Sequence, residues 1–266
     1  MIKVKSNTKE IPIKFWTFPA GEVGVRVEDT AAVLVAKTLT ITLIFDGSND
    51  IITLLMLVDA LRSTNTQAEI ELFIPYFPYA RQDRICAEGE SFSLRVFCDI
   101  IKSVGFKRIK TCDLHSSVTA GMFTAGILTE ISQKTMFISR FQFDKNMALV
   151  APDNGSVKKT QELAKHYNLP VLEFTKVRDV ETGNIIATKA TEDINTFVYN
   201  HGITQFVVVD DICDGGRTFI EIAKVIKQEQ PNIKLHLRVS HGIFSKGKEE
   251  LLEYYDTVQS VYDLSN

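Results

Sequence analysis

The chain has 266 residues, of which 45% are hydrophobic, so it can bury the core of one large domain or of two small ones. Its formal net charge is −3 with acids and bases interspersed, which argues against a general nucleic-acid surface and against a surface for anionic membranes. The four cysteines form no C-x-x-C pair and no zinc-like spacing with the five histidines, and the apolar run 51–58 is too short to span a bilayer. We therefore expect a cytoplasmic protein with reduced thiols.

The first half of the chain predicts strands that alternate with helices. Short β-like pieces around a turn at 18–22 come first, so the chain opens with antiparallel or mixed pairing. The pattern then predicts, in order, a strand at 39–45, a helix at 51–61 behind an N-cap at 48–50, a strand at 69–75, a helix at 94–104 and a strand at 108–112. The segment 76–91 carries aromatic and charged residues without a period, so we expect a loop with a phosphate partner.

The second half repeats this plan. The predicted order is a strand at 148–151, a helix at 157–167, a strand at 171–174, a β excursion at 185–190, a strand at 206–209, a helix at 219–226, a strand at 234–240 and a helix at 248–254. Alternating strands and helices predict an α/β fold with a mainly parallel sheet. No linker or short repeat divides the chain, and we place the boundary between two halves, 1–131 and 132–266, near Ile131.

Polar clusters follow five of the predicted strands. They are Arg81 with Gln82 and Asp83; Asp113 with His115; Asp153; Lys176 with Arg178; and Asp210 with Asp211 and Asp214. Parallel strands would bring these clusters to one rim, and a rim with acids and fixed cations suits phosphoryl-type transfer. A histidine near a core strand is more often a structural hydrogen-bonding residue than a metal ligand, and Asp153 in a Pro-Asp-Asn-Gly turn is ordinary turn chemistry.

The stretch 207–218 carries the most specific pattern. Three valines form a buried strand, and the acids Asp210, Asp211 and Asp214 then offer acceptors to sugar hydroxyls or to a metal ion. Gly215 and Gly216 allow backbone amides to turn toward a phosphate, and Thr218 opens an amphipathic helix. These features predict a ribose phosphate ligand. The alternative is that the acids only cap the next helix.

This stretch resembles the ribose-binding signature that phosphoribosyltransferases share with phosphoribosyl pyrophosphate synthetases. Further segments favour the synthetases, because they occur in that family's order: 49–62, 75–84, 113–115, 152–155, 176–178 and 240–244. The chain is therefore similar to the ribose-phosphate pyrophosphokinase family from about residue 18 to residue 244. The resemblance implies two phosphoribosyltransferase-like, Rossmann-like halves, with residues 1–131 on the ATP side and 132–266 on the ribose phosphate side.

The resemblance also implies a reaction, in which the β,γ-diphosphate of MgATP moves to the anomeric hydroxyl of a ribose 5-phosphate moiety and AMP leaves. Phe18, Glu22, Arg81, Gln82 and Asp83 would bind ATP, and a neighbouring subunit would complete the adenine pocket, which implies a dimer or a higher homo-oligomer. The implied catalytic residues are Lys176, Arg178 and His115, and His115 with Asp153 would hold Mg²⁺. The ribose phosphate would be bound by Asp210, Asp211, Asp214, Gly215, Gly216, Arg217 and Thr218.

The chain departs from the family pattern at three places. Arg217 stands in the phosphate loop where the family has small and hydroxyl residues, so the acceptor is either ribose 5-phosphate or a compound extended at the phosphate, with ADP-ribose as the leading candidate and NAD salvage as its context. Ala20 replaces an Asn or Asp that can read the adenine edge, and Glu88 and Glu90 stand where cations are commoner. A catalytically silent regulatory subunit and a phosphoribosyltransferase are the competing interpretations.

Overall fold

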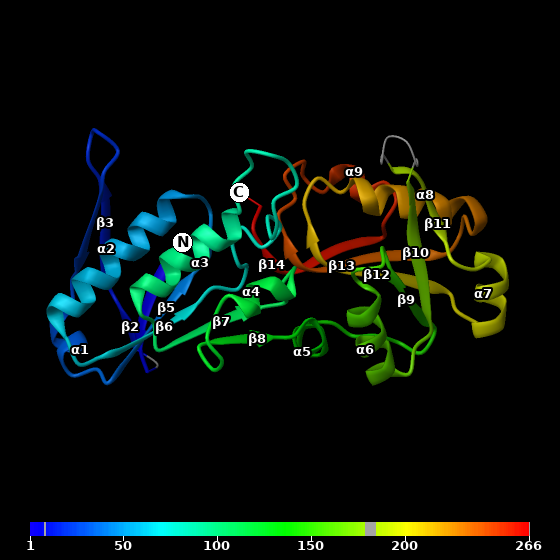
Figure 1. Ribbon diagram of the computed structural model, residues 1–266. Helices are drawn as coiled ribbons and strands as arrows, with labels where there is room; N and C mark the ends of the chain where they lie inside the picture. Colours follow the sequence, from blue (N-terminus) through cyan, green and yellow to red (C-terminus); the bar gives the residue numbers. More distant parts are fainter. Residues whose placement is uncertain (8, 179–184, 266) are drawn as a thin grey trace. The chain divides into compact units, whose positions relative to one another are not determined.

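The computed structural model describes residues 1–7, 9–178 and 185–265. The chain divides into two compact units, Met1–Ile131 and Ser132–Asn266. Each unit is an α/β structure with a mainly parallel six-stranded sheet, which confirms the predicted fold class (Figure 1). No helix of the described ranges is long and apolar enough to cross a membrane.

The sheet of the first unit has the strand order β2-β1-β5-β6-β7-β8. Strands β5 to β8 are parallel, whereas β1, which the sequence pattern did not predict, runs antiparallel to both β2 and β5. The bounds are β1 Ile2–Ser6, β2 Lys9–Ile11, β5 Thr38–Leu43, β6 Glu69–Phe73, β7 Arg108–Cys112 and β8 Leu128–Ile131. A separate hairpin comprises β3 Ile13–Thr17 and β4 Val23–Val27.

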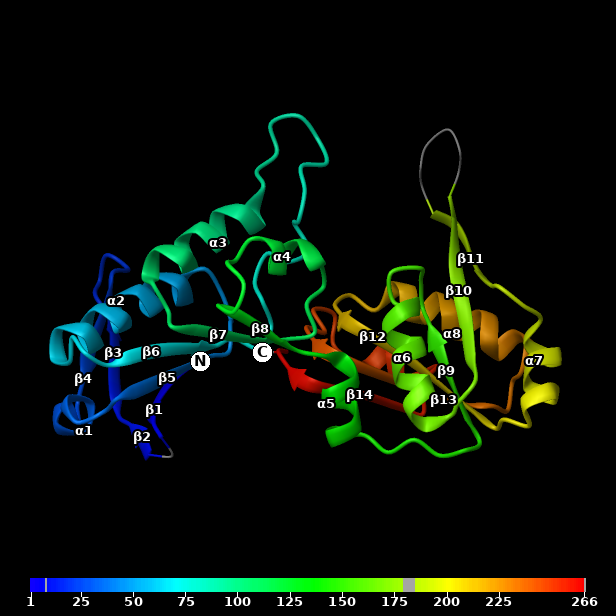
Figure 2. The same cartoon turned by 60° about the horizontal axis from the view of Figure 1, so that its bottom comes forward.

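The helices of the first unit bury their apolar sides against this sheet. They are α1 Thr30–Leu34, α2 Asn49–Thr64, α3 Ser93–Val104 and α4 Ser117–Gly121. Leu54 and Leu57 of α2 and Phe97 of α3 are almost completely buried in one apolar core with Ile41 of β5. The hairpin β3–β4 packs beside α2 through β4, and Figure 2 shows α2, α3 and α4 together on one face of the sheet.

The sheet of the second unit has the order β11-β10-β9-β12-β13-β14, and only β11 is antiparallel to its neighbour. The bounds are β9 Met147–Ala151, β10 Val171–Arg178, β11 Ile185–Ala190, β12 Gln205–Cys213, β13 Lys234–Gly242 and β14 Thr257–Asp263. The helices are α5 Gln133–Arg140, α6 Val157–Tyr167, α7 Ile194–His201, α8 Arg217–Glu229 and α9 Glu249–Leu252. Figures 1 and 2 show α8 on one face of this sheet and α5 and α6 on the other.

The structure corrects the predicted boundary of β12. The sequence pattern ends this strand at residue 209 and places Asp210 and Asp211 in a loop, which is wrong. The strand continues to Cys213, because its far end pairs in parallel with β13, Ile212 opposite His241 and Cys213 opposite Gly242. Tertiary pairing therefore overrides the low strand propensity of aspartate, and the two acids become neighbours on a strand whose side chains point to opposite faces.

The expected N-cap of α2 also differs in its chemistry. Ser48 stands at the N-cap position, but its side chain makes no capping hydrogen bond. Its hydroxyl lies 3.2 Å from the Tyr79 hydroxyl. Ser48 therefore connects the start of α2 to the irregular segment that follows β6, the segment expected to be a loop.

Candidate active site

The turn after β9 is fixed by its own aspartate. Asp153 Oδ1 accepts hydrogen bonds from the backbone N–H of Gly155 at 3.0 Å and of Ser156 at 3.3 Å, and the Ser156 hydroxyl donates to the Asp153 carbonyl at 2.7 Å. This closed turn brings the chain into α6 directly beyond the carboxyl end of β9. The Asp153 carboxylate is thereby held at the edge of the sheet where α/β proteins bind ligands.

Three carboxylates interact electrostatically near this edge, and we call Asp153, Asp210 and Asp211 the acid cluster. Asp210 Oδ1 accepts a hydrogen bond from the Asp211 backbone N–H at 2.9 Å. Burial, together with the negative charges of Asp211 and Asp153, raises the pKa of Asp210 well above its usual value. An ionised cluster of this kind is stabilised by hydroxyl donors or by a cation, which are the partners that a ribose or a metal ion would supply.

Lys159 is a cation of this site that the sequence analysis did not identify. Its Nζ lies 3.9 Å from Asp211 Oδ2, and the Asp211 side chain is only 10% exposed. The strand alternation explains the contact, because Asp211 shares a face with Val207 and Val209, and α6 covers that face. Lys159 therefore neutralises part of the charge of the acid cluster before any ligand binds.

The segment 214–218, the phosphate loop, leads from β12 into α8. Gly216 occupies the N-cap of α8 with a positive φ of 77°, and a Cβ there would lie 3.2 Å from a methyl group of Leu251. Glycine is thus favoured both by the backbone conformation and by the space. The Tyr255 hydroxyl donates to the Phe219 carbonyl at 2.8 Å and fixes the first turn of α8. The first amides of a helix lack intrahelical acceptors, so this end can receive a phosphate.

Arg217 does not fill the phosphate loop. Its side chain is 86% exposed, and its Nε donates to Glu221 Oε1 at 2.9 Å, one turn further along α8. Glu221 also accepts a hydrogen bond from the Thr188 hydroxyl of β11 at 3.1 Å. The guanidinium therefore lies along the outside of the helix, and the loop keeps room for a phosphate.

Lys176 and Arg178 lie on β10, the strand next to β9. The backbone of Lys176 pairs with Thr188 of β11, and the register shifts between Val177 and Arg178. The pattern expected this pair directly after a strand that ended at residue 174, whereas the strand continues through Arg178. The backbone of Lys176 therefore belongs to the hairpin β10–β11. This hairpin lies next to β9, the strand that Asp153 follows.

The first unit carries the other predicted residues. Arg81 and Gln82 are exposed and Asp83 is half-buried, in the irregular segment between β6 and α3. Glu90 has a structural role in that segment, because its carboxylate accepts the backbone N–H of Cys86 at 2.7 Å and of Ala87 at 3.1 Å. A glutamate at this position therefore closes a turn of the loop.

His115 follows β7, and its side chain is exposed. The preceding residues are held by β8, since the Asp113 N–H donates to the Ile131 carbonyl at 2.9 Å and the Leu114 N–H donates to Glu130 Oε1 at 2.8 Å. The pairing of His115 with Asp153 on a metal joins residues of two units and stays a prediction. Among the described residues, no group of three His, Cys, Asp or Glu side chains could hold a metal alone.

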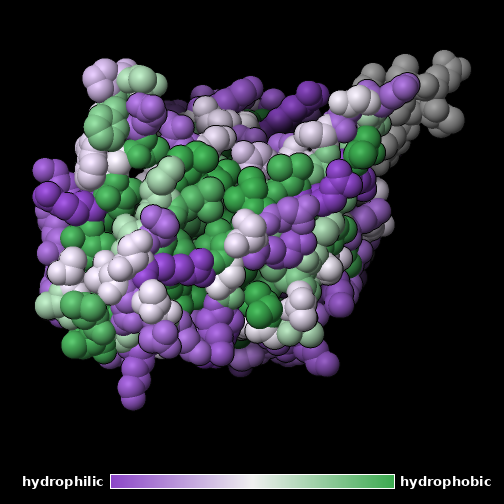
Figure 3. Space-filling model, turned by 60° about the vertical axis from the view of Figure 1, so that its left-hand side comes forward, coloured by the Kyte–Doolittle hydropathy of each residue, from purple (hydrophilic) through white to green (hydrophobic). Residues whose placement is uncertain are grey.

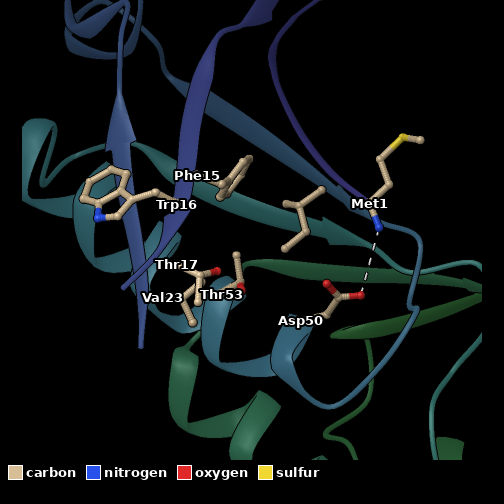
Figure 4. Close-up of a pocket in the computed structure, with 8 residues that line it drawn as sticks. Met1, Phe15, Trp16, Thr17, Val23, Asp50 and Thr53 are labelled. Carbon is tan, nitrogen blue, oxygen red and sulfur yellow. Dashed lines mark ion pairs between the residues drawn. The ribbon is translucent and has the colours of Figure 1, made fainter. Parts of the chain in front are cut away.

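Phe18 and Glu22 lie in the turn of the hairpin β3–β4. The Phe18 N–H donates to the Glu22 carbonyl at 2.8 Å, and the Phe18 side chain is 48% exposed. Beside the turn, Trp16 lies over Gly24, where any Cβ would overlap the indole. A hollow of about 310 Å³ opens between this hairpin and the start of α2, and Figure 4 shows the residues that line it, among them Phe15, Trp16 and Asp50.

A parallel α/β unit with carboxylates at the end of β12 and a glycine loop that opens α8 is a phosphoribosyltransferase-type domain. The model of the phosphoribosyl transferase domain matches residues 120–262, and the model of the N-terminal domain of ribose phosphate pyrophosphokinase matches residues 1–105. The chain therefore belongs to the ribose-phosphate pyrophosphokinase family of diphosphokinase transferases.

Relatives agree with this assignment. The chain is 27% identical over 239 residues to the putative ribose-phosphate pyrophosphokinase 2 of Streptococcus pneumoniae, which covers 89% of this chain and 71% of the relative. It is 29% identical over 217 residues to the ribose-phosphate pyrophosphokinase of Mycoplasmopsis pulmonis, covering 81% and 64% of the two chains. The fold is similar to that of phosphoribosylpyrophosphate synthetase from Mycobacterium smegmatis, with a TM-score of 0.75, 21% identity, and coverage of 96% of this chain and 88% of that chain.

Proposed function

We propose that this protein transfers the β,γ-diphosphate of MgATP to the 1-hydroxyl of a ribose 5-phosphate moiety. The oxygen of the hydroxyl attacks the β-phosphorus, the bond between that phosphorus and the oxygen of the α-phosphate breaks, AMP leaves, and the hydroxyl proton passes to solvent. One observation carries the proposal: the acid cluster and the phosphate loop flank the same end of β12, so one sugar can meet carboxylates at its hydroxyls and helix amides at its phosphate.

The remaining residues take the roles that the family resemblance implies. Asp210, Asp211 and Asp214 bind the ribose hydroxyls, and Gly215 to Thr218 bind the 5-phosphate. Lys176 and Arg178 stabilise the charge on the transferring group, while Phe18, Glu22 and the residues 81–83 bind ATP. Phosphoryl transfer depends mainly on positioning and on neutralising charge, which cations of this kind supply.

The Asp153 carboxylate suits a magnesium ion that arrives with the nucleotide. Mg²⁺ prefers oxygen ligands, keeps several waters and binds through one or two carboxylates together with substrate phosphates. The Asp153 carboxylate is held in place by its closed turn, and His115 is exposed at the end of β7. When bound, the ion would neutralise the phosphates of ATP, and the family resemblance implies Asp153 and His115 as its ligands.

Two acceptors fit the open phosphate loop. Ribose 5-phosphate needs only the loop itself, and the outward position of Arg217 leaves that loop free. ADP-ribose extends the same moiety by a second phosphate and an adenosine. It is favoured by the presence of an arginine in this loop, where the family has small and hydroxyl residues.

The direct test is AMP release from MgATP in the presence of ribose 5-phosphate or of ADP-ribose. We expect AMP with at least one acceptor and none without an acceptor. Release from neither acceptor, by protein shown to be folded by circular dichroism, would contradict the proposal and favour a silent regulatory subunit. Product formation that does not need ATP would favour a phosphoribosyltransferase.

A homo-oligomer is also proposed, because one side of the first unit is apolar. Helix α2 buries Leu54 and Leu57, yet its outer side also carries hydrophobic residues, and Ile52 and Met56 are 45% and 48% exposed. Val96 of α3 is also exposed. Figure 3 looks onto this side of the molecule and shows hydrophobic residues gathered there. A helix that is hydrophobic all round is normally covered on both sides.

The substitution Met56→Glu tests this surface. We expect it to weaken self-association by at least about tenfold, because an interface core disfavours an unpaired charge. Light scattering after size exclusion measures the effect. Tyr199→Glu on α7, where the tyrosine is 88% exposed, is the matched control and should leave the assembly unchanged. A monomeric wild-type protein would contradict the proposal.

A further inference from the structure

The loop after β13 covers one side of the phosphate loop. The backbone N–H groups of Ile243 and Phe244 both donate to the Cys213 carbonyl, at 2.8 and 3.1 Å. The Ser245 hydroxyl donates to Asp214 Oδ1 at 2.6 Å. These bonds follow from the parallel pairing of β12 with β13, which brings the two strand ends to one level. The segment 243–247, the β13 loop, is thus part of the acceptor site.

Lys246 projects from the β13 loop across the phosphate loop. A Cβ on Gly215 would lie 3.7 Å from both Cδ and Cε of Lys246. The aliphatic stem of the lysine therefore passes within van der Waals reach of the glycine, and its ammonium group lies one bond beyond the stem, at the rim. Lysine commonly packs its methylene groups on a surface while its charged end stays in water.

The ammonium group of Lys246 makes no ion pair with the described residues. Lys248, two residues further on, is different: its Nζ lies 2.6 Å from Asp263 Oδ2 and 4.4 Å from the centre of the Phe244 ring. Lys248 thus stabilises the β13 loop, whereas Lys246 brings a cation to the rim of the phosphate loop.

Arg217, the cation of the phosphate loop itself, is engaged elsewhere. Its Nε donates to Glu221 Oε1 one turn along α8, and Glu221 also accepts from Thr188 of β11, so the guanidinium lies along the outside of the helix. Lys246 instead reaches the loop from the side of β13, outside the amides that would bind the first phosphate. A cation outside a phosphate site favours an anion that extends beyond that site.

We infer that Lys246 binds the second phosphate of an acceptor that is a ribose 5-diphosphate ester. This inference rests on the proposed function and names the acceptor class. A terminal phosphomonoester presents three oxygens and needs many donors, whereas an internal phosphate of a diphosphate ester presents two. The loop carries one hydroxyl, on Thr218, which suits the internal phosphate, and the next phosphate then meets the Lys246 ammonium group.

The test compares Lys246→Ala with wild type on two acceptors, measuring kcat/KM for AMP release. With ADP-ribose we expect a loss of about tenfold or more, the effect of one charge-assisted hydrogen bond. With ribose 5-phosphate we expect a change of less than about twofold, as for an ordinary surface substitution. Lys246→Arg should keep most of the ADP-ribose activity. Lys234→Ala is the matched control, since Lys234 is exposed at the opposite end of β13.

Equal losses with both acceptors would overturn the inference and leave the proposed function intact, because Lys246 would then serve the first phosphate. A wild-type enzyme that uses only ribose 5-phosphate would also overturn it. If wild type releases AMP with neither acceptor, the proposed function fails. The role of Lys246 is then tested by calorimetry, which compares the binding of ADP-ribose to wild type and to Lys246→Ala without ATP. Weaker binding by Lys246→Ala would support the second-phosphate site, and unchanged binding would contradict it.

Discussion

Lys176→Ala lowers kcat for AMP release by about 10²- to 10³-fold and leaves the fold intact. A fixed cation that meets charge developing on a transferring phosphoryl group contributes to the transition state and little to the stability of the ligand-free protein. Lys176 belongs to β10, and its backbone pairs with Thr188. Because the strand pairing needs only backbone atoms, alanine keeps it. We expect KM for the acceptor to change far less than kcat, which steady-state kinetics of AMP release would show.

The matched control is Lys189→Ala. Lys189 lies on β11 of the same hairpin, pairs with Thr175 and has an exposed side chain. This variant removes one lysine from the same hairpin and should keep wild-type activity. Equal activity of Lys176→Ala and wild type would exclude the role that the family resemblance gives to Lys176. Equal losses in both variants would point to an effect of net charge on this hairpin.

The parts of the fold that the sequence predicted well are those with strong local patterns. The bounds of β7 and α6 agree with the predicted ranges 108–112 and 157–167. Strand β9 is buried at every position, and α6 alternates buried residues such as Leu163 with charged ones before it ends at Asn168 in the left-handed conformation. Each signal is contained in a few consecutive residues, so one sequence suffices to detect it.

The elements that were missed lack such signals. Strand β14 has no fully buried residue and owes its existence to pairing with β13. Helix α1 has only five residues, which is too short for a helical period to show in the sequence. Its N-cap, Asp29, accepts a hydrogen bond from the Ala32 N–H. The extension of β12 through two aspartates depends on a partner strand about thirty residues away. Local propensity cannot report pairing at that distance.

The same distinction holds in the candidate site. The acids and glycines of 210–216 could be selected because they lie within one short stretch of the sequence. The contacts of Lys159 with Asp211 and of Ser245 with Asp214 join residues 52 and 31 positions apart, and they exist because α6 covers one face of β12 and because β12 pairs with β13. These contacts around the acceptor site therefore depend on the topology. The predicted parallel sheet indicates only that residues at the carboxyl ends of neighbouring strands lie close together.

Asp210→Asn has opposite effects on stability and activity. The Asp210 carboxylate is desolvated and faces the negative charges of Asp211 and Asp153, which is why its pKa is raised. Asparagine has nearly the same shape, keeps an oxygen for the Asp211 N–H and carries no charge, so it relieves the repulsion. We expect the melting temperature of the ligand-free protein at pH 7.5 to rise by about 3 °C, while kcat/KM falls about a hundredfold with the loss of a charged acceptor for the ribose hydroxyl.

Asp256→Asn is the control for this pair of effects. Asp256 lies beyond α9, where its Oδ2 accepts the Leu235 N–H at 2.8 Å, far along β13 from the acid cluster. Its replacement by asparagine should neither raise the melting temperature nor lower the activity. A stabilised and fully active Asp210→Asn would mean that the acid cluster is not the acceptor site. A destabilised variant would mean that the Asp210 carboxylate stabilises the fold. A carboxylate whose role is to bind a ligand should instead lower the stability of the ligand-free protein.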